Sequence, residues 1–200
     1  GLEDCKIMAS NSLDEYTITS LLIQGGPIDI FGVGERLITS KSDPVFGAVY
    51  KIASIEKDGM WEPRIKISES VEKITNPGLK KVYRVYNDKG RAIADLLTLL
   101  REVPDTEEPY RYIDPEQPWR ELYFENCTFK EMKQLIIKDG KLVVNLPTLE
   151  EIRAYVQDQL ANEIWPEEQR FENPHRHYLD MSPSYYQLKM DLLNRIYRKK

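Results

Sequence analysis

Cysteine is scarce in this sequence: its 200 residues include only Cys5 and Cys127, and they form no Cys-x-x-Cys pair. This usage excludes a disulfide framework, gives no support for a zinc or redox site, and fits a protein of the reduced cytoplasm. Long apolar runs are also absent, since none approaches the roughly 18 residues of a membrane span. We therefore expect a cytoplasmic protein with no membrane partner.

An excess of basic residues is absent as well. The sequence has 28 Lys and Arg against 33 Asp and Glu, for a formal net charge of -5. This balance provides no general attraction to nucleic acid, so we expect no nucleic-acid partner. No initiator methionine or targeting signal is recognisable, and a hydrophobic stretch begins within a few residues of Gly1. We expect the chain to be part of a longer protein.

The N-terminal part of the sequence predicts a strand, a helix and a second strand. Lys6–Ala9 is a short apolar run that ends in small polar residues, which is typical of a buried parallel strand. Ser12 and Glu15 form a capping-box pattern at the start of a helix, and Gly25-Gly26 end it. The second strand is predicted over Ile28–Phe31.

Two loops should leave the same edge of this sheet, because a crossover helix makes the two strands parallel. Their residues are Ser10, Asn11 and Ser12 after the first strand, and Gly32, Val33, Gly34 and Glu35 after the second. Neighbouring loops rich in backbone N–H groups at this position can hold phosphate. The glycines form neither a Walker loop nor a complete dinucleotide fingerprint, since Leu37 occupies the third glycine position. They are therefore either ordinary turn residues or half of a phosphate pocket.

From Ala48 onward the pattern changes to short strands separated by turns. The predicted strands are Val49–Ile55, Arg64–Ile67, Lys80–Val85 and Arg91–Asp95, and the turns are Asp58-Gly59, Asn76-Pro77-Gly78 and Asp88-Lys89-Gly90. Consecutive strands linked by turns predict an antiparallel meander. We therefore expect residues 1–47 to be the end of a larger parallel α/β domain. Residues 48–200 should form a second domain that is smaller than that complete domain.

The remainder predicts an irregular segment, a hairpin and two helices. Residues 101–128 are dense in Pro, Glu and aromatic residues, and a hairpin is predicted over 135–145 around an Asp-Gly turn. Thr148 should cap a helix that continues to Pro166, and Ser182-Pro183 should begin the last helix.

The two histidines, His175 and His177, lie close together in the sequence. A His-x-His pair can bind a metal ion, but no third ligand at a suitable spacing is evident, so we expect no metal site. No Ser or Cys nucleophile signature lies nearby, so we expect no hydrolytic triad at these residues.

Five stretches, in order, resemble the second half of the nicotinate phosphoribosyltransferase family. They are ASNSLDE, IDIFGVGERLITS, FGAVYKI, KISESVEKITNPGLKKVYR and NPHRHYLDMSPSYYQLK. The resemblance extends over nearly the whole chain. It implies the final βαβ part of an irregular type II phosphoribosyltransferase α/β barrel, followed by a smaller α+β C-terminal domain with antiparallel strands and terminal helices.

The resemblance also implies an activity. Family members join nicotinate to the ribose of phosphoribosyl pyrophosphate (PRPP), forming nicotinate mononucleotide and pyrophosphate with ATP hydrolysis, in NAD salvage. The implied substrates are nicotinate, PRPP and ATP, with Mg²⁺ accompanying ATP, and the implied full-length assembly is a homodimer. The phosphorylated histidine of the family lies upstream, so we expect no catalytic residue in this segment and no activity from it alone.

By position, Ser10–Ser12 match the loop after the penultimate barrel strand, and Gly32–Gly34 match the turn whose amides hold the ribose 5-phosphate. Glu35 departs from the family pattern, because many relatives have threonine there, and Arg36 is a candidate to compensate. Two alternatives stay open. One is a related phosphoribosyltransferase for another pyridine base, and the other is a non-catalytic phosphate- or nucleotide-binding module.

Overall fold

The computed structural model describes residues 1–45, 47, 49–70, 73–105 and 109–198. The chain divides into two compact units, Gly1–Tyr50 and Lys51–Lys200. Each unit contains both helices and strands, which agrees with the α/β class expected from the sequence. The predicted boundary between residues 47 and 48 involves residue 48, which lies outside the described residues.

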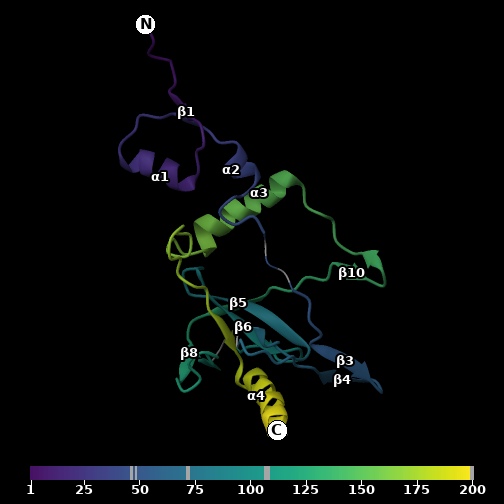
Figure 1. Cartoon of the computed structure of the whole chain (residues 1–200). Helices are drawn as coiled ribbons and strands as arrows, with labels where there is room; N and C mark the ends of the chain where they lie inside the picture. The colour runs from purple at the N-terminus through teal and green to yellow at the C-terminus, as the bar shows by residue number, and fades with distance from the viewer. Residues whose placement is uncertain (46, 48, 71–72, 106–108, 199–200) are drawn as a thin grey trace. The chain divides into compact units, whose positions relative to one another are not determined.

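The first unit is built from two strands and two helices (Figure 1). They are β1 (Met8–Ser10), α1 (Glu15–Ile23), β2 (Ile30–Gly32) and α2 (Glu35–Ile38). β1 and β2 are parallel, with Met8 beside Ile30 and Ser10 beside Gly32. The predicted βαβ unit is therefore confirmed, with both strands displaced slightly toward the C-terminus.

Helix α1 begins differently from the prediction. Asp14 has extended backbone angles and caps the helix by accepting a hydrogen bond from the Thr17 N–H at 2.8 Å. The capping box predicted from Ser12 and Glu15 is wrong, because Ser12 has a left-handed φ of 49° and precedes the true cap. The Glu15 carboxylate instead accepts a hydrogen bond from the Ser42 hydroxyl.

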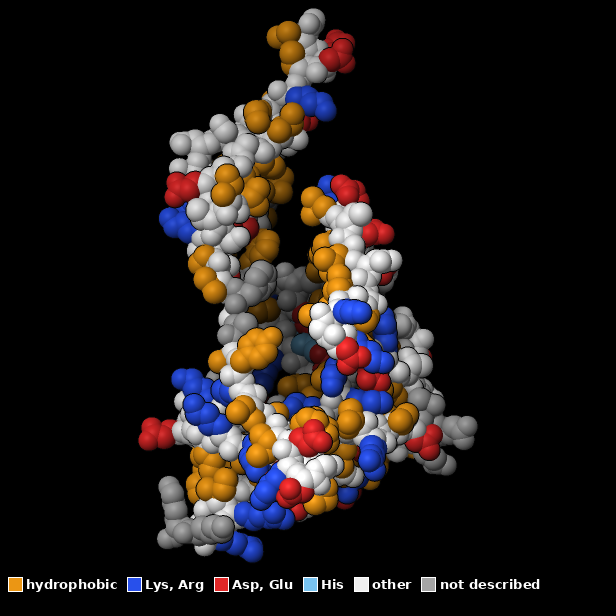
Figure 2. Space-filling model, turned by 90° about the vertical axis from the view of Figure 1, so that its right-hand side faces the viewer, with side chains coloured by type: hydrophobic (Ala, Val, Ile, Leu, Met, Phe, Trp, Pro, Cys, Tyr) orange, Lys and Arg blue, Asp and Glu red, His pale blue; other side chains and the backbone are white. Residues whose placement is uncertain are grey.

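The first unit buries little apolar surface. Among its described residues only Leu13 is a buried hydrophobic residue. Exposed apolar side chains surround the strands and helices (Figure 2): Ile7, Met8, Leu22, Ile23, Ile30, Leu37 and Ile38. A two-stranded sheet is marginally stable in water and usually needs further strands or a packed helix. This unit therefore has apolar faces that additional secondary structure could cover.

The second unit is organised around a four-stranded sheet in the order β12-β6-β5-β9. Its strands are β5 (Lys80–Tyr86), β6 (Ala92–Leu99), β9 (Thr128–Glu131) and β12 (Leu179–Met181). β5 and β6 are antiparallel and joined through the predicted Asp88-Lys89-Gly90 turn. β9 is antiparallel to β5, whereas β12 is parallel to β6. The predicted simple meander is wrong, because both outer strands come from distant parts of the chain.

Among its described residues, this unit also contains three two-stranded pairs. They are β3 (Ser54–Lys57) with β4 (Met60–Pro63), β7 (Tyr110–Tyr112) with β8 (Leu122–Phe124), and β10 (Ile137–Lys138) with β11 (Lys141–Leu142). The first and last pairs confirm the Asp-Gly turn predictions. The strand predicted over Val49–Ile55 begins only at Ser54, and Arg64–Ile67 forms no strand. Residues 101–128, expected to be irregular, contain both β7 and β8.

The core of the second unit covers both faces of its sheet, because successive strand residues point to opposite sides. The first cluster of buried residues is Tyr83, Val85, Ala94, Leu96 and Phe124. The second cluster joins Leu97 and Met181 to Tyr185 of helix α4 (Pro183–Tyr197). Tyr185 is fully buried, and its hydroxyl donates to the Pro77 carbonyl at 2.8 Å. Helix α4 is thereby fixed to the sheet and to the segment that precedes β5.

Both C-terminal helices begin where the sequence predicts. Helix α3 (Leu149–Asp158) has a capping box in which Thr148 and Glu151 each accept a hydrogen bond from the other's backbone N–H, and a π-helical turn (Gln159–Glu163) extends it. Ser182 caps α4 by accepting from the Tyr185 N–H. None of the helices in the described ranges is long and apolar enough to cross a membrane.

Candidate phosphate-binding site

The two predicted loops lie side by side at the carboxyl ends of β1 and β2. Ser10 and Gly32 are register partners in the parallel pair. The strands approach closely here, since a Cβ added to Gly32 would lie 3.1 Å from Ser10 Cβ and 3.3 Å from Met8 Cε. Gly32 is thus needed for the close approach that brings Ser10–Ser12 beside Gly32–Gly34.

The backbone of the first loop turns sharply. Asn11 and Ser12 have positive φ angles of 87° and 49°. Asparagine tolerates the left-handed region better than most residues, which explains its place in this loop. The parallel pairing of Ser10 with Gly32 uses the N–H of the residue that follows on one strand, Asn11 or Val33, whereas no acceptor is recorded for the N–H groups of Ser12 and Gly34 among the described residues. Free backbone N–H groups in such turns are suited to an anion.

A hollow of about 400 Å³ opens beside the second loop. Its lining includes Val33, Arg36 and the two acidic residues at the start of α1, Asp14 and Glu15. Arg36 Nη1 lies 3.1 Å from Asp14 Oδ2, so its charge is already paired. Hydrogen bonds from Thr17 lower the pKa of Asp14, which keeps this carboxylate ionised at neutral pH. Arg36 could therefore contact a phosphate only by leaving Asp14.

Glu35 occupies the first position of α2, directly after the Gly34 cap. A carboxylate in the first turn of a helix is favoured by the helix dipole. The Glu35 side chain is exposed, and its backbone carbonyl accepts hydrogen bonds from the Thr39 N–H and hydroxyl. Glu35 and the nearby Asp14 and Glu15 are all acidic, so the side chains here attract an anion only weakly. Anion binding at these loops would therefore depend on backbone N–H groups.

A polar cluster that sequence patterns did not reveal surrounds His177 in the second unit. His177 Nδ1 lies 3.1 Å from Glu168 Oε1, and Nε2 lies 3.5 Å from Asp95 Oδ1, at ion-pair distance. Asp95 also accepts from Arg84 Nε at 3.0 Å. Contact with Asp95 raises the pKa of His177, burial opposes the shift, and Glu168 adds to it. His177 therefore bridges two carboxylates of the second unit.

Substitution of His177 by glutamine should lower stability in a pH-dependent manner. Because the folded state raises the pKa of His177, its stabilisation is complete below the ordinary pKa and is lost as pH rises through the folded value. We expect a loss of about 2 kcal/mol at pH 6, where the charged hydrogen bond to Glu168 and the ion pair with Asp95 persist, and a smaller loss at pH 8.5. Urea unfolding at both pH values measures the difference.

The exposed His175 provides the matched control. His175→Gln should change stability little at either pH. An equal loss for His177→Gln at pH 6 and pH 8.5 would contradict the charge-bridge interpretation.

Comparison with known proteins identifies a protein family and several proteins that this chain resembles. The family model for the nicotinate phosphoribosyltransferase C-terminal domain matches residues 79–189. Nicotinate phosphoribosyltransferase of Bacillus subtilis is 36% identical over 197 residues, covering 98% of this chain and 40% of the relative. That of Caenorhabditis elegans is 35% identical over 189 residues, covering 92% of this chain and 32% of the relative.

The human nicotinate phosphoribosyltransferase is 30% identical over 187 residues, which are 90% of this chain and 33% of the relative. A crystal structure of human nicotinic acid phosphoribosyltransferase matches with a TM-score of 0.72 at 24% identity, covering 96% of this chain and 34% of that chain. This structural likeness concerns the fold. The chain spans at most 40% of the length of these relatives.

Proposed function

The chain belongs to the nicotinate phosphoribosyltransferase family, and we propose that it forms the C-terminal part of an enzyme with that activity. The enzyme would form nicotinate mononucleotide and pyrophosphate from nicotinate and PRPP, coupled to ATP hydrolysis, in NAD salvage. The observation that carries the proposal is the pairing of Ser10 with Gly32, which brings the two family-matching loops together.

In this proposal the two loops anchor the 5-phosphate of the ribose. The N–H groups of Ser12 and Gly34, for which no acceptor is recorded among the described residues, would donate to the phosphate oxygens without a titrating side chain. Glycosyl transfer passes through an oxocarbenium-like centre, so catalysis depends mainly on positioning the reactants and stabilising the departing pyrophosphate. Binding energy at the remote phosphate would orient the ribose for that step.

The bond-making residues are assigned to the part of the enzyme that this chain does not include. His175 is exposed, and His177 contacts Asp95 and Glu168. Neither is therefore proposed as the phosphorylated histidine that the family resemblance implies. Within the described residues, no three His, Cys, Asp or Glu side chains form a metal-binding cluster. No set here fits Mg²⁺, and we assign the binding of ATP and Mg²⁺ to the rest of the enzyme.

We further propose that β1 and β2 are the last two strands of an α/β barrel and that residues 48–200 form the following domain. The exposed apolar side chains around β1 and β2 support this, because the other barrel strands would cover them. A cytoplasmic homodimer is proposed from the family resemblance. The free thiols of Cys5 and Cys127 agree with a reduced compartment.

An assay of the full-length enzyme tests the activity. Purified protein is incubated with PRPP, ATP and Mg²⁺ and with nicotinate, nicotinamide or quinolinate, and the mononucleotide product is quantified. We expect turnover of nicotinate to exceed that of the other two bases. Preferential use of another base would favour the related phosphoribosyltransferase, and absence of turnover in folded protein would contradict an enzymatic role.

A further inference from the structure

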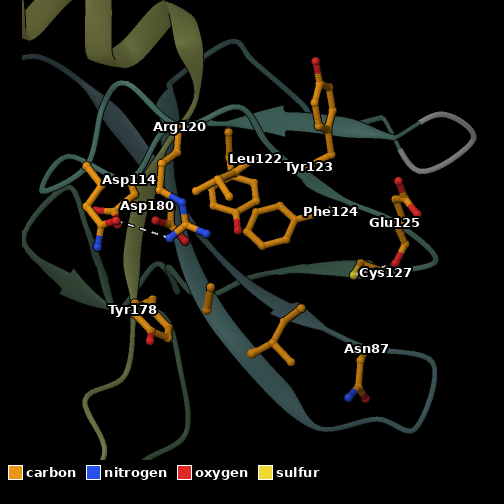
Figure 3. A pocket seen from close by; sticks show the side chains of 14 residues that line it. Asn87, Asp114, Arg120, Leu122, Tyr123, Phe124, Glu125, Cys127, Tyr178 and Asp180 are labelled. Carbon is orange, nitrogen blue, oxygen red and sulfur yellow. Dashed lines mark hydrogen bonds between the residues drawn. The ribbon is translucent and has the colours of Figure 1, made fainter.

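A second pocket lies in the Lys51–Lys200 unit, beside strands β6, β8 and β12 (Figure 3). Its volume is about 550 Å³. Pockets of this size accommodate small organic molecules. Its lining includes no residue of the two phosphate loops.

Asp180 is the unusual residue of this pocket. It lies on β12, is only 4% exposed, and lines the pocket wall. Within the described residues no hydrogen bond or ion pair to its carboxylate is recorded, although a largely buried charge normally requires a partner, and the carboxylate lines the pocket. Burial and then the nearby Asp114 raise the pKa of Asp180 to about 7, while His177 opposes the shift. A carboxylate that is half-ionised near neutral pH therefore opens onto the pocket.

The charge at this end of the pocket is predominantly negative. Asp114, Asp180 and Arg120 gather there, whereas Glu125 lies toward the other end (Figure 3). Arg120 is exposed and donates a hydrogen bond to the Gln117 side chain at 3.3 Å. Two carboxylates and one guanidinium lie at this end, so a positively charged ligand would relieve the repulsion between Asp114 and Asp180.

An apolar and aromatic wall completes the pocket. The Tyr112 and Phe124 rings stack with their centroids 3.9 Å apart and 11° between their planes. Ala94 is buried, and Ile93 packs against the same core cluster. Aromatic rings favour flat apolar groups and attract cations. The wall suits a flat apolar group and the carboxylates suit a positive charge, so a matching ligand would have both.

We propose that this pocket binds a small organic cation that has N–H donors and a flat apolar group, with the donors directed at the carboxylates of Asp180 and Asp114. The Asp180 carboxylate receives the hydrogen bonds that no described residue provides. The aromatic wall contacts the apolar part of the ligand.

Calorimetric titration of the full chain with benzamidine tests the proposal, because this amidinium has a flat ring and remains charged across the accessible pH range. Benzamide has a similar shape without the charge, and benzoate carries the opposite charge. We expect benzamidine to bind and the other two to bind at least about tenfold more weakly. Failure of benzamidine to bind, or tighter binding of benzoate, would overturn the proposal.

Asp180→Asn should weaken benzamidine binding by about tenfold or more, since it removes the charge while keeping the shape. Asp139→Asn makes the same change in the exposed β10–β11 turn, outside the pocket lining, and should leave affinity unchanged. Equal affinities for Asp180→Asn and the unchanged chain would refute the site. Asp114→Asn is a second test and should also weaken binding.

Two further readouts distinguish a binding residue from a structural one. Benzamidine affinity should rise between pH 6 and pH 8, as Asp180 loses its proton, and this dependence should shrink in Asp180→Asn, where only the neighbouring His177 still titrates. Without ligand, the asparagine variant should melt at the same or a higher temperature than the unchanged chain at pH 8, because an unpartnered buried carboxylate is removed. A lower melting temperature would identify a structural role and contradict the proposal.

Discussion

Replacement of Gly32 by alanine should reduce kcat/KM for PRPP by about 100-fold in the full-length enzyme, because a small displacement of a positioning group can have an effect of this size. The added Cβ would lie 3.1 Å from Ser10 Cβ and 3.3 Å from Met8 Cε. These contacts are too short, so the strand ends must separate by a few tenths of an ångström. The separation occurs where the two loops are proposed to hold the 5-phosphate.

Gly47→Ala is the matched control, since a Cβ at Gly47 would meet no atom within 4 Å and the residue lies outside both loops. It should leave kcat/KM for PRPP close to that of the unchanged enzyme. Melting temperatures of both variants verify folding. A folded Gly32→Ala enzyme with unchanged kcat/KM would contradict the role assigned to the close approach of the strands.

Replacement of Tyr185 by alanine should lower the free energy of unfolding by about 3–5 kcal/mol, as for other large buried aromatic residues. Tyr185 is fully buried and packs with Leu97 and Met181, so its removal leaves a cavity between α4 and the sheet. Tyr185→Phe should lose about 1 kcal/mol, because only the hydrogen bond to the Pro77 carbonyl is removed. Urea denaturation measures both changes.

Tyr197 is a control of the same residue type on the same helix. It is 55% exposed at the end of α4, so Tyr197→Ala should have only a small effect on stability. Equal losses for Tyr185→Ala and Tyr197→Ala would show that the contact between α4 and the sheet does not stabilise the second unit.

Local signals predicted the parts of the fold that depend on neighbouring residues. The β1–α1–β2 unit and the starts of α3 and α4 follow from apolar periodicity and capping side chains close in sequence. The sheet order does not, because β9 and β12 join β5 and β6 from distant parts of the chain. The capping prediction at Ser12 was wrong because the left-handed turn at Asn11 and Ser12 delays the start of α1.

The same distinction applies to the candidate sites. The pairing of Ser10 with Gly32 could be predicted, because parallel strands joined by a crossover helix end at one sheet edge. The ion pair between Arg36 and Asp14 could not, since it joins a residue of α2 to the cap of α1, two elements that are separated in the sequence. The pocket around Asp180 is lined by residues from separate strands, so it could not be predicted from the sequence either. Contacts between distant segments, rather than motifs, determine these features.

The central claim is that the loops after β1 and β2 together hold the ribose 5-phosphate. A crystal structure of the full-length enzyme with PRPP bound tests it most directly. We predict that the 5-phosphate oxygens lie within hydrogen-bond distance, about 2.7–3.2 Å, of backbone nitrogens in both Ser10–Ser12 and Gly32–Gly34. A 5-phosphate held by other residues, with neither loop in contact, would contradict the account.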